Sequence, residues 1–498
     1  MITLKRTAVR IGGVLGTVLL LCCVILTSGR AAGPAASQAV VKDFNPSVNC
    51  PDATLADIDH FDLGMIKALQ QGISGLPCDG EPEQSGTDFT AKLQHGFDYY
   101  SWLTFIALNS PAKGGKFSGA NMPTVWETYK QLPDVMLPGG ARPADWTDPN
   151  PPIVPSQCAS EFKAGMMIIH MEAEETYNEP FKSGALFDQN GNYALFVILM
   201  NHQMFQYIAD HSLYSRKGQQ DFAGEIDFPN GSDGSEKDHP EKTLGAVMIK
   251  ASWKLMKDSD LVRPKYHIVD ALLYRPNAPQ PCRAVKLGLI GFHVGHKTVT
   301  RQQWIWTTFE HHDNVPTQKE IDDGSAKRKQ YSFYDPKQSD RPVNQTPPWP
   351  WDPDALGWVP FQKPSNFKSQ IVRTGPSPVF PDDDVGKLNT AFHNWQQIRG
   401  TVWENYDLIT TQWPSGFPCA SLPHPGNLPD ATCAPFPAYL ANTTLETFSQ
   451  PQQDTDTQDA EKTVPLATSS CIACHNNATT QHRPATRSDF TYILEKAK

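Results

Sequence analysis

Four short segments in the middle of the chain constrain its fold most, because each has the composition of a β-strand. They are apolar and rich in Val, Ile, Trp or alternating residues, whereas Pro, Gly and charged residues interrupt the chain around them. We therefore expect them to pair in one central, mostly antiparallel sheet. The segments are residues 244–253, 266–274, 287–296 and 303–309.

Helical spacing of apolar residues occurs on both sides of these segments. Residues 54–69 and 89–108 repeat apolar side chains at intervals of three or four, which predicts two helices. A longer stripe from residue 388 predicts a further amphipathic helix. Together the patterns predict an α+β fold, a large mixed body in which helices flank the sheet. The stripe consists of Leu388, Phe392, Trp395, Ile398, Val402, Tyr406 and Ile409.

The N-terminus has the order of a secretory signal peptide. Basic residues come first, an uncharged apolar run from Ile11 to about Leu26 follows, and small residues continue to about residue 36. We expect cleavage of residues 1–36, with retention as a membrane anchor as the alternative. No later stretch is apolar enough to cross a bilayer. The mature chain is therefore expected to be exported and to have no stable membrane span.

Composition divides the rest of the chain into three parts. Residues 37–448 form the predicted body, and their number fits one large domain or two subdomains. Residues 449–470 are polar and acidic, which is typical of a solvated tether. Residues 471–498 remain as a short C-terminal segment.

The net charge of the chain argues against some classes of binding partner. The formal net charge is −10 at pH 7. An acidic chain is a poor candidate for binding nucleic acid or anionic lipid. The same charge would suit a basic redox partner protein, although it also serves solubility.

Cysteine usage agrees with export. Eight of the ten cysteines lie beyond the predicted signal peptide, and two of these, Cys471 and Cys474, belong to the motif described next. The other six allow fifteen disulfide connectivities. Among these we expect the pairs that join neighbours along the chain, which are Cys50–Cys78, Cys158–Cys282 and Cys419–Cys433.

The motif with a defined chemistry is Cys471-Ile-Ala-Cys474-His475. Attachment of haem c requires this arrangement, because the two thiols add to the vinyl groups of haem and the adjacent imidazole binds the iron. Half of a zinc site is one alternative, but the chain has no second cysteine pair of this spacing. A thioredoxin-like dithiol is another, but it would be expected near an early junction between a strand and a helix.

Through this motif the C-terminal segment resembles the c-type cytochromes. The resemblance implies thioether bonds at Cys471 and Cys474, a proximal iron ligand at His475, one covalent haem c and a periplasmic location. It is confined to residues 471–498. The body is also similar to large bacterial proteins described only as cytochrome c family members. The common small cytochromes have a distal methionine downstream of the motif, whereas no methionine follows residue 256 here.

A sixth iron ligand must therefore come from upstream or from His482. On the predicted strand 287–296, His293 shares a face with Leu289 and two glycines, whereas His296 points to the other face. Glycines on either side of His293 would leave a flat gap for the haem ring, so we take His293 as the distal candidate. The alternative for His293 is a buried, hydrogen-bonded histidine that does not bind iron. An upstream methionine could also be the ligand, and the alternative for those methionines is packing in the core.

These features support two functional hypotheses. The first is an exported monohaem cytochrome that acts in periplasmic electron transfer with a redox partner protein and has six-coordinate iron. The second is a haem-dependent peroxidase or oxygenase with an open sixth iron position, and a haem sensor would share that open position. The second hypothesis would use His293, Trp304, Trp306 or the cluster Glu310-His-His-Asp313 beside the haem.

Overall fold

The computed structural model describes most of the chain from residue 87 to residue 498. The predicted signal peptide 1–36, the predicted helix 54–69 and the cysteine pairs Cys50–Cys78 and Cys419–Cys433 lie outside the described residues, as does most of the predicted tether 449–470. The residues left out between 87 and 498 are 113–122, 148–149, 174–175, 178, 181–182, 234–241, 264, 299–300, 348–366, 375–383, 396, 415–434 and 451–468.

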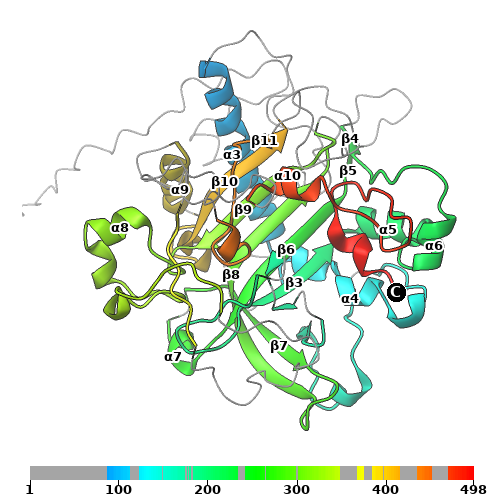
Figure 1. The fold of residues 1–498 in the computed structure, drawn as a ribbon, viewed down its shortest axis with the longest axis horizontal. Helices are drawn as coiled ribbons and strands as arrows, with labels where there is room; N and C mark the ends of the chain where they lie inside the picture. The colour runs from blue at the N-terminus through cyan, green and yellow to red at the C-terminus, as the bar shows by residue number, and fades with distance from the viewer. Residues whose placement is uncertain are drawn as a thin grey trace, which may run out of the picture. The chain divides into compact units, whose positions relative to one another are not determined.

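Within the described residues, a nine-stranded sheet forms the centre of the body (Figure 1). Its main path runs β1-β3-β6-β8-β9-β10-β11, while β7 pairs with β8 and β2 pairs with β7. Every pair is antiparallel except β2 with β7. The strands are β1 Lys130–Gln131, β2 Met167–His170, β3 Leu195–Met200, β6 Val247–Leu255, β7 Ile268–Tyr274, β8 Cys282–His296, β9 Ile305–His311, β10 Tyr406–Pro414 and β11 Pro435–Phe436.

The helices flank this sheet, so the predicted α+β fold is confirmed, and the four predicted strands correspond to β6, β7, β8 and β9. A separate two-stranded sheet is formed by β4 Gly231–Asp233 and β5 Lys242–Leu244. The helices are α3 Thr87–Leu108, α4 Leu132–Val135, α5 His202–Asp210, α6 Arg216–Asp221, α7 Asp258–Leu261, α8 Gln318–Asp322, α9 Asp384–Asn394 and α10 Cys471–His475.

Strand β8 organises the sheet because three strands pair with it. Its first half pairs with β7, its second half pairs with β9, and β6 runs along its other edge. The pairing with β6 shifts between Ser252 and Trp253, where Ile290 is the extra residue. Such a bulge reverses the alternation of side chains. Leu289 therefore joins the core with Phe292, and the expectation that it shares the face of His293 is wrong.

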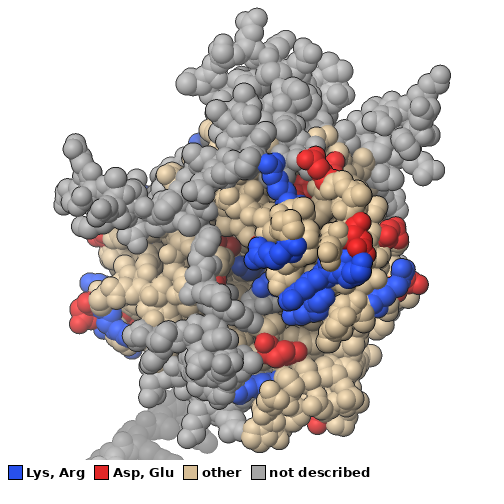
Figure 2. Space-filling model, turned by 45° about the vertical axis from the view of Figure 1, so that its right-hand side comes forward, with Lys and Arg blue, Asp and Glu red and all other residues tan. Residues whose placement is uncertain are grey.

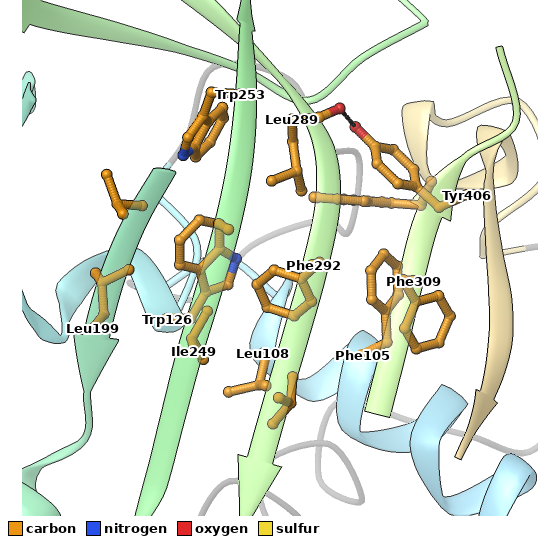
Figure 3. Close-up of a cluster of buried hydrophobic side chains, with 14 of the residues drawn as sticks. Phe105, Leu108, Trp126, Leu199, Ile249, Trp253, Leu289, Phe292, Phe309 and Tyr406 are labelled. Atoms are coloured by element: carbon orange, nitrogen blue, oxygen red, sulfur yellow. Dashed lines mark hydrogen bonds between the residues drawn. The ribbon is translucent and has the colours of Figure 1, made fainter. Parts of the chain in front are cut away.

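The main core lies between the sheet and the helices α3 and α9. Figure 3 shows Phe105 and Leu108 of α3 directed at residues of β3, β6, β8, β9 and β10. The Trp102 ring stacks on Phe392 of α9 at 4.7 Å between centroids. The Tyr406 hydroxyl donates to the Leu289 carbonyl at 2.9 Å. The predicted helix 89–108 is confirmed, because α3 spans Thr87–Leu108 and buries its apolar face here.

The predicted helix from residue 388 is correct only for its first part. Helix α9 ends at Asn394, Gly400 has a φ of 77°, and a short 3-10 helix spans Val402–Asn405 before β10 begins at Tyr406. Gly400 lies six residues beyond the end of α9, and its left-handed backbone turns the chain so that the helix does not resume before β10. The apolar spacing continued by coincidence, because both faces of β10 are buried and the strand shows no alternation.

The predicted disulfide Cys158–Cys282 is confirmed. Its Cα atoms are 5.5 Å apart, and it joins the 3-10 helix Ser156–Cys158 to the first residue of β8. The bond closes a loop of 124 residues in sequence. Because a crosslink of this length removes many conformations from the unfolded chain, it stabilises the fold.

Replacing both cysteines, Cys158→Ala with Cys282→Ala, should lower the free energy of unfolding by about 2–5 kcal/mol. Chemical denaturation of the oxidised variant and wild type would measure the difference. Reduced wild type is the matched control, and it should unfold at nearly the same denaturant concentration as the variant. An oxidised wild type no more stable than the variant would contradict the loop-closure argument.

Candidate haem-attachment site

Helix α10 is a single turn formed by the motif itself, Cys471–His475. The Ser470 side chain caps the turn by accepting a hydrogen bond from the Ala473 N–H at 3.3 Å. Residues one, four and five of a helical turn share one face. Cys471, Cys474 and His475 are accordingly partly exposed, while the residues between the cysteines are buried. Both thiols are free, so the turn presents two thiols and an imidazole on one side.

A glutamine of the sheet holds the start of this turn. The Gln412 side-chain oxygen, on β10, accepts from the Ile472 N–H at 2.9 Å and from the Ser470 hydroxyl at 3.1 Å. The buried Ile472 packs in the cluster that includes Met248 and Trp306. In Figure 1, α10 lies in front of the sheet, and the rest of the C-terminal segment continues from it to the right. The motif is thus attached to the body by hydrogen bonds and by apolar packing.

The orientation of His475 is set by its own hydrogen bond. Its Nδ1 lies 2.7 Å from the Phe490 carbonyl oxygen. A carbonyl only accepts, so Nδ1 carries the proton and Nε2 keeps its lone pair. Burial lowers the pKa of His475 to about 4, which keeps the ring neutral at pH 7. Neutral imidazole with one nitrogen hydrogen-bonded is the form in which histidine binds a metal.

Two aromatic side chains enclose the His475 ring. Its centroid lies 4.3 Å from that of Trp306 and 5.2 Å from that of Tyr492. The Tyr492 hydroxyl donates to the Cys474 carbonyl at 2.9 Å and lies 3.9 Å from the Cys474 Sγ. Within the described part of the chain, no group forms a hydrogen bond with His475 Nε2. The ring is therefore fixed on three sides while its metal-binding nitrogen stays available.

The two thiols are weaker acids than those of a reactive dithiol. Burial raises the pKa of Cys474 to about 11 and raises that of Cys471 well above its usual value. Catalytic and metal-binding cysteines depend on the thiolate, which a lowered pKa provides. In the described residues, no group of three or more His, Cys, Asp or Glu side chains could hold a metal ion. The two thiols therefore lack the lowered pKa that dithiol or zinc chemistry uses.

A buried ion pair holds the carbonyl that fixes His475. Asp489 and Phe490 have φ values of 49° and 58°, which cost non-glycine residues roughly 1–2 kcal/mol each. The Asp489 carboxylate accepts from Lys297 Nζ at 2.5 Å and from the Phe228 N–H at 2.7 Å. Both charged side chains are fully buried. Because Lys297 directly follows β8, the sheet positions the Phe490 carbonyl, and this carbonyl positions His475.

A group of polar side chains lies on the face of the sheet that α10 covers. Nδ1 of His293 lies 2.6 Å from the Thr308 hydroxyl, and its Nε2 lies 2.7 Å from the Glu446 carboxylate. Lys250 Nζ lies 3.9 Å from the same carboxylate. Burial alone would raise the pKa of Glu446, but His293 and Lys250 outweigh it and lower the pKa to about 2. Lys250 and Met248 share one face of β6, and Met248 packs in the same apolar cluster as Ile472, so the group lies on the side of the sheet that carries the motif.

Iron ligation by His293 stays a prediction. The structure places His293 on the α10 side of the sheet, as expected, and His296 on the other side, where the hydroxyl of Tyr100 on α3 contacts it. The expected flat gap, however, is filled by protein. A Cβ on Gly291 would lie 2.2 Å from the Thr444 hydroxyl, and one on Gly295 would lie 2.9 Å from the Met248 methyl group. These glycines allow segment 442–446 and Met248 to approach β8.

The candidate residues of the cluster 310–313 do not lie together. His311 is buried and stacks on Tyr266 at 3.9 Å, whereas its neighbour His312 is exposed. Glu310 pairs with Arg373 and accepts from the Thr443 N–H at 2.7 Å. The cluster 310–313 therefore does not converge on one point, as expected for adjacent strand residues.

Two further candidates are Trp304, which lies against the C-terminal segment, and His482, which belongs to it. The Trp304 indole nitrogen lies 3.5 Å from the Asp489 carboxylate, and His482 contacts the Thr480 hydroxyl at 2.9 Å. Trp306 is the sequence candidate that contacts the motif. Sequence reasoning missed Lys297, Asp489, Phe490 and Glu446, because no local pattern links any of them to the motif.

Lys297→Met should lower the free energy of unfolding by about 3–5 kcal/mol, because it leaves the buried Asp489 carboxylate without its cation. Lys217→Met is the matched control, since it removes an exposed lysine that pairs with Asp221, and it should change the stability by less than about 1 kcal/mol. Guanidinium unfolding would measure both. Equal effects of the two substitutions would show that the buried pair does not hold the C-terminal segment.

The comparisons with known proteins identify no relative. No protein-family model, no curated protein and no solved structure matches the chain. In the described residues, none of the helices combines the length and the apolar character that a membrane crossing requires.

Proposed function

We propose that the chain is an exported c-type cytochrome that carries one haem c and acts in periplasmic electron transfer. Cys471 and Cys474 would form the thioether bonds, and His475 Nε2 would bind the iron as the proximal ligand. The observation that carries the proposal is the fixed ring of His475. Its Nδ1 is committed to the Phe490 carbonyl, its Nε2 is available, and both free thiols share its face of α10.

Haem c supplies a one-electron redox centre when it is bound. The residues of this chain would hold and tune that centre. The hydrogen bond from His475 Nδ1 to Phe490 fixes the ring orientation and makes Nε2 a stronger donor to iron. Trp306 and Tyr492 pack against the ring and reduce its contact with water. Gln412 anchors the start of the turn, so the two thiols keep their spacing.

A specific observation favours a second candidate function, a haem-dependent peroxidase or oxygenase with an open sixth iron position. The polar group of Lys250, His293 and Glu446 lies beside the motif and is mostly buried. Glu179, which is also buried and whose pKa burial raises to about 8, lies close enough to Glu446 for their charges to interact. Acid and base groups at a haem can transfer protons to a bound substrate, which an electron carrier does not require.

Expression in a strain that matures c-type cytochromes should give a protein with one covalent haem. Cys471→Ser with Cys474→Ser should abolish covalent attachment completely, as measured by the pyridine haemochrome spectrum and by haem staining of the denatured protein. Cys158→Ala with Cys282→Ala is the matched control, since it removes two cysteines outside the motif and should retain covalent haem in the folded fraction. A wild-type protein without covalent haem would contradict the proposal.

The reduced spectrum with and without carbon monoxide separates the two candidate functions. A low-spin spectrum that carbon monoxide leaves unchanged is expected for a six-coordinate electron carrier, and His293→Ala would then test the distal ligand. A high-spin spectrum that shifts with carbon monoxide would instead favour the oxidoreductase. Peroxide and oxygen turnover would be measured in that case.

A further inference from the structure

The segment that carries the motif has a charge opposite to that of the whole chain. The chain has a net charge of −10, yet residues 471–498 contain four basic residues and only two acidic ones. One of the acidic residues, Asp489, is fully buried and paired with Lys297, so it contributes little to the surface. Arg483, Arg487 and Lys498 are exposed. The surface of this segment is therefore basic.

Helix α6 extends this basic surface. The Gln219 side chain donates to the Leu494 carbonyl at 2.8 Å and accepts from the Gln481 N–H at 2.9 Å, while the Arg216 N–H donates to the Lys498 carbonyl at 3.2 Å. Arg216 and Lys217, both exposed on α6, consequently lie beside the C-terminal segment. We call this region the C-terminal basic surface. It comprises Arg216, Lys217, Arg483, Arg487, Lys496 and Lys498, with Asp221 and Glu495 as acidic members and with half-exposed Asp227, which pairs with Lys297 beside Asp489, as a further acidic neighbour.

The view of the molecule agrees with this placement. When the right-hand side of Figure 1, which carries α6 and the C-terminal end, is turned forward, Lys and Arg side chains gather on that face, with Asp and Glu side chains around them (Figure 2). The same segment contacts the motif, because Tyr492, in the 3-10 helix Tyr492–Lys496, touches Cys474 and His475. The basic surface thus adjoins the partly exposed face of α10.

We propose that the C-terminal basic surface is the docking site of an acidic redox partner protein. The inference rests on the proposed function, because it takes the haem to be attached at α10. Charges are screened over about 8–10 Å at physiological salt, so a docking partner responds to the local charge more than to the net charge. Complementary charges around the contact accelerate association and orient the two proteins.

This inference reverses the sign expected from composition. A net charge of −10 suggests a basic partner, but net charge averages over the whole surface, whereas electrons pass only where the haem approaches a partner. The surface carries six basic residues, two of them next to acidic neighbours, which is a small patch for tracking a nucleic-acid backbone. An acidic protein is therefore the occupant that the charge and the position favour.

Small redox reagents of opposite charge test the local charge at the haem. The reduced holoprotein would be oxidised by anionic ferricyanide and, separately, by cationic tris(phenanthroline)cobalt(III), each over a range of ionic strengths. The proposal predicts that ferricyanide oxidation slows as salt is added, although protein and reagent are both negative overall. Oxidation by the cobalt complex should accelerate with salt or stay constant. Ferricyanide oxidation that accelerates with salt would overturn the proposal.

Charge-reversal substitutions test which basic residues form the docking surface. Arg483→Glu with Arg487→Glu should slow ferricyanide oxidation about fivefold or more at low salt and reverse its salt dependence. The matched control is Lys327→Glu with Arg328→Glu, which makes the same change in net charge at exposed positions near α8, on the other side of Figure 1. The control should stay within about twofold of wild type. Equal effects of both variants would show that only net charge matters.

A measurement that needs no haem separates this inference from the proposed function. At pH 7 and low salt, both the wild type and Cys471→Ser with Cys474→Ser should bind immobilised polyglutamate, and Arg483→Glu with Arg487→Glu should not. Loss of covalent haem from the wild type would contradict the proposed function, whereas loss of polyglutamate binding would overturn the basic surface. Retention of the protein on immobilised duplex DNA at about 0.15 M salt would assign the surface to nucleic acid instead and overturn the proposal.

Discussion

The hydrogen-bond ladders on the two edges of β8 are the constraint on which the rest of the structure depends. One edge pairs with β6 along the second part of the strand, and the other pairs first with β7 and then with β9. β8 also begins at Cys282, which the disulfide ties to Cys158, and ends just before Lys297, which pairs with Asp489. One strand therefore connects the core, the disulfide and the C-terminal segment, and any shift in its register would move all three.

The candidate site illustrates how little of a functional site is local. A helix of one turn is not stable alone, because nucleating it costs more than its few hydrogen bonds return. Here Gln412 of β10 anchors its start, Ile472 fills an apolar cluster of the body, and the Phe490 carbonyl orients its histidine. The strained backbone at Phe490 is held in turn by the buried Lys297–Asp489 pair. A motif of five residues thus acquires a defined geometry from three distant parts of the chain.

The charge of one local surface also differs from the net charge of the chain. The acidic balance of the chain describes an average, but the fold brings α6 beside the C-terminal segment and collects basic side chains there. Burial of Asp489 removes one of the two carboxylates of that segment from the surface. The partners that a protein surface favours depend on this local field, which composition alone does not describe.

The sequence by itself determined the features that arise from neighbouring residues. The strands 244–253, 266–274, 287–296 and 303–309, the helix ending at Leu108 and the Cys158–Cys282 pair were all readable, because residue type and spacing control them directly. Only the tertiary structure decided that the stripe from Leu388 breaks at Asn394, that a bulge turns Leu289 into the core, and that Thr444 fills the space at Gly291. It also decided that Lys297 and Asp489 meet. These outcomes depend on contacts between residues far apart in the chain, where packing and buried charge outweigh local preference, and no local pattern encodes them.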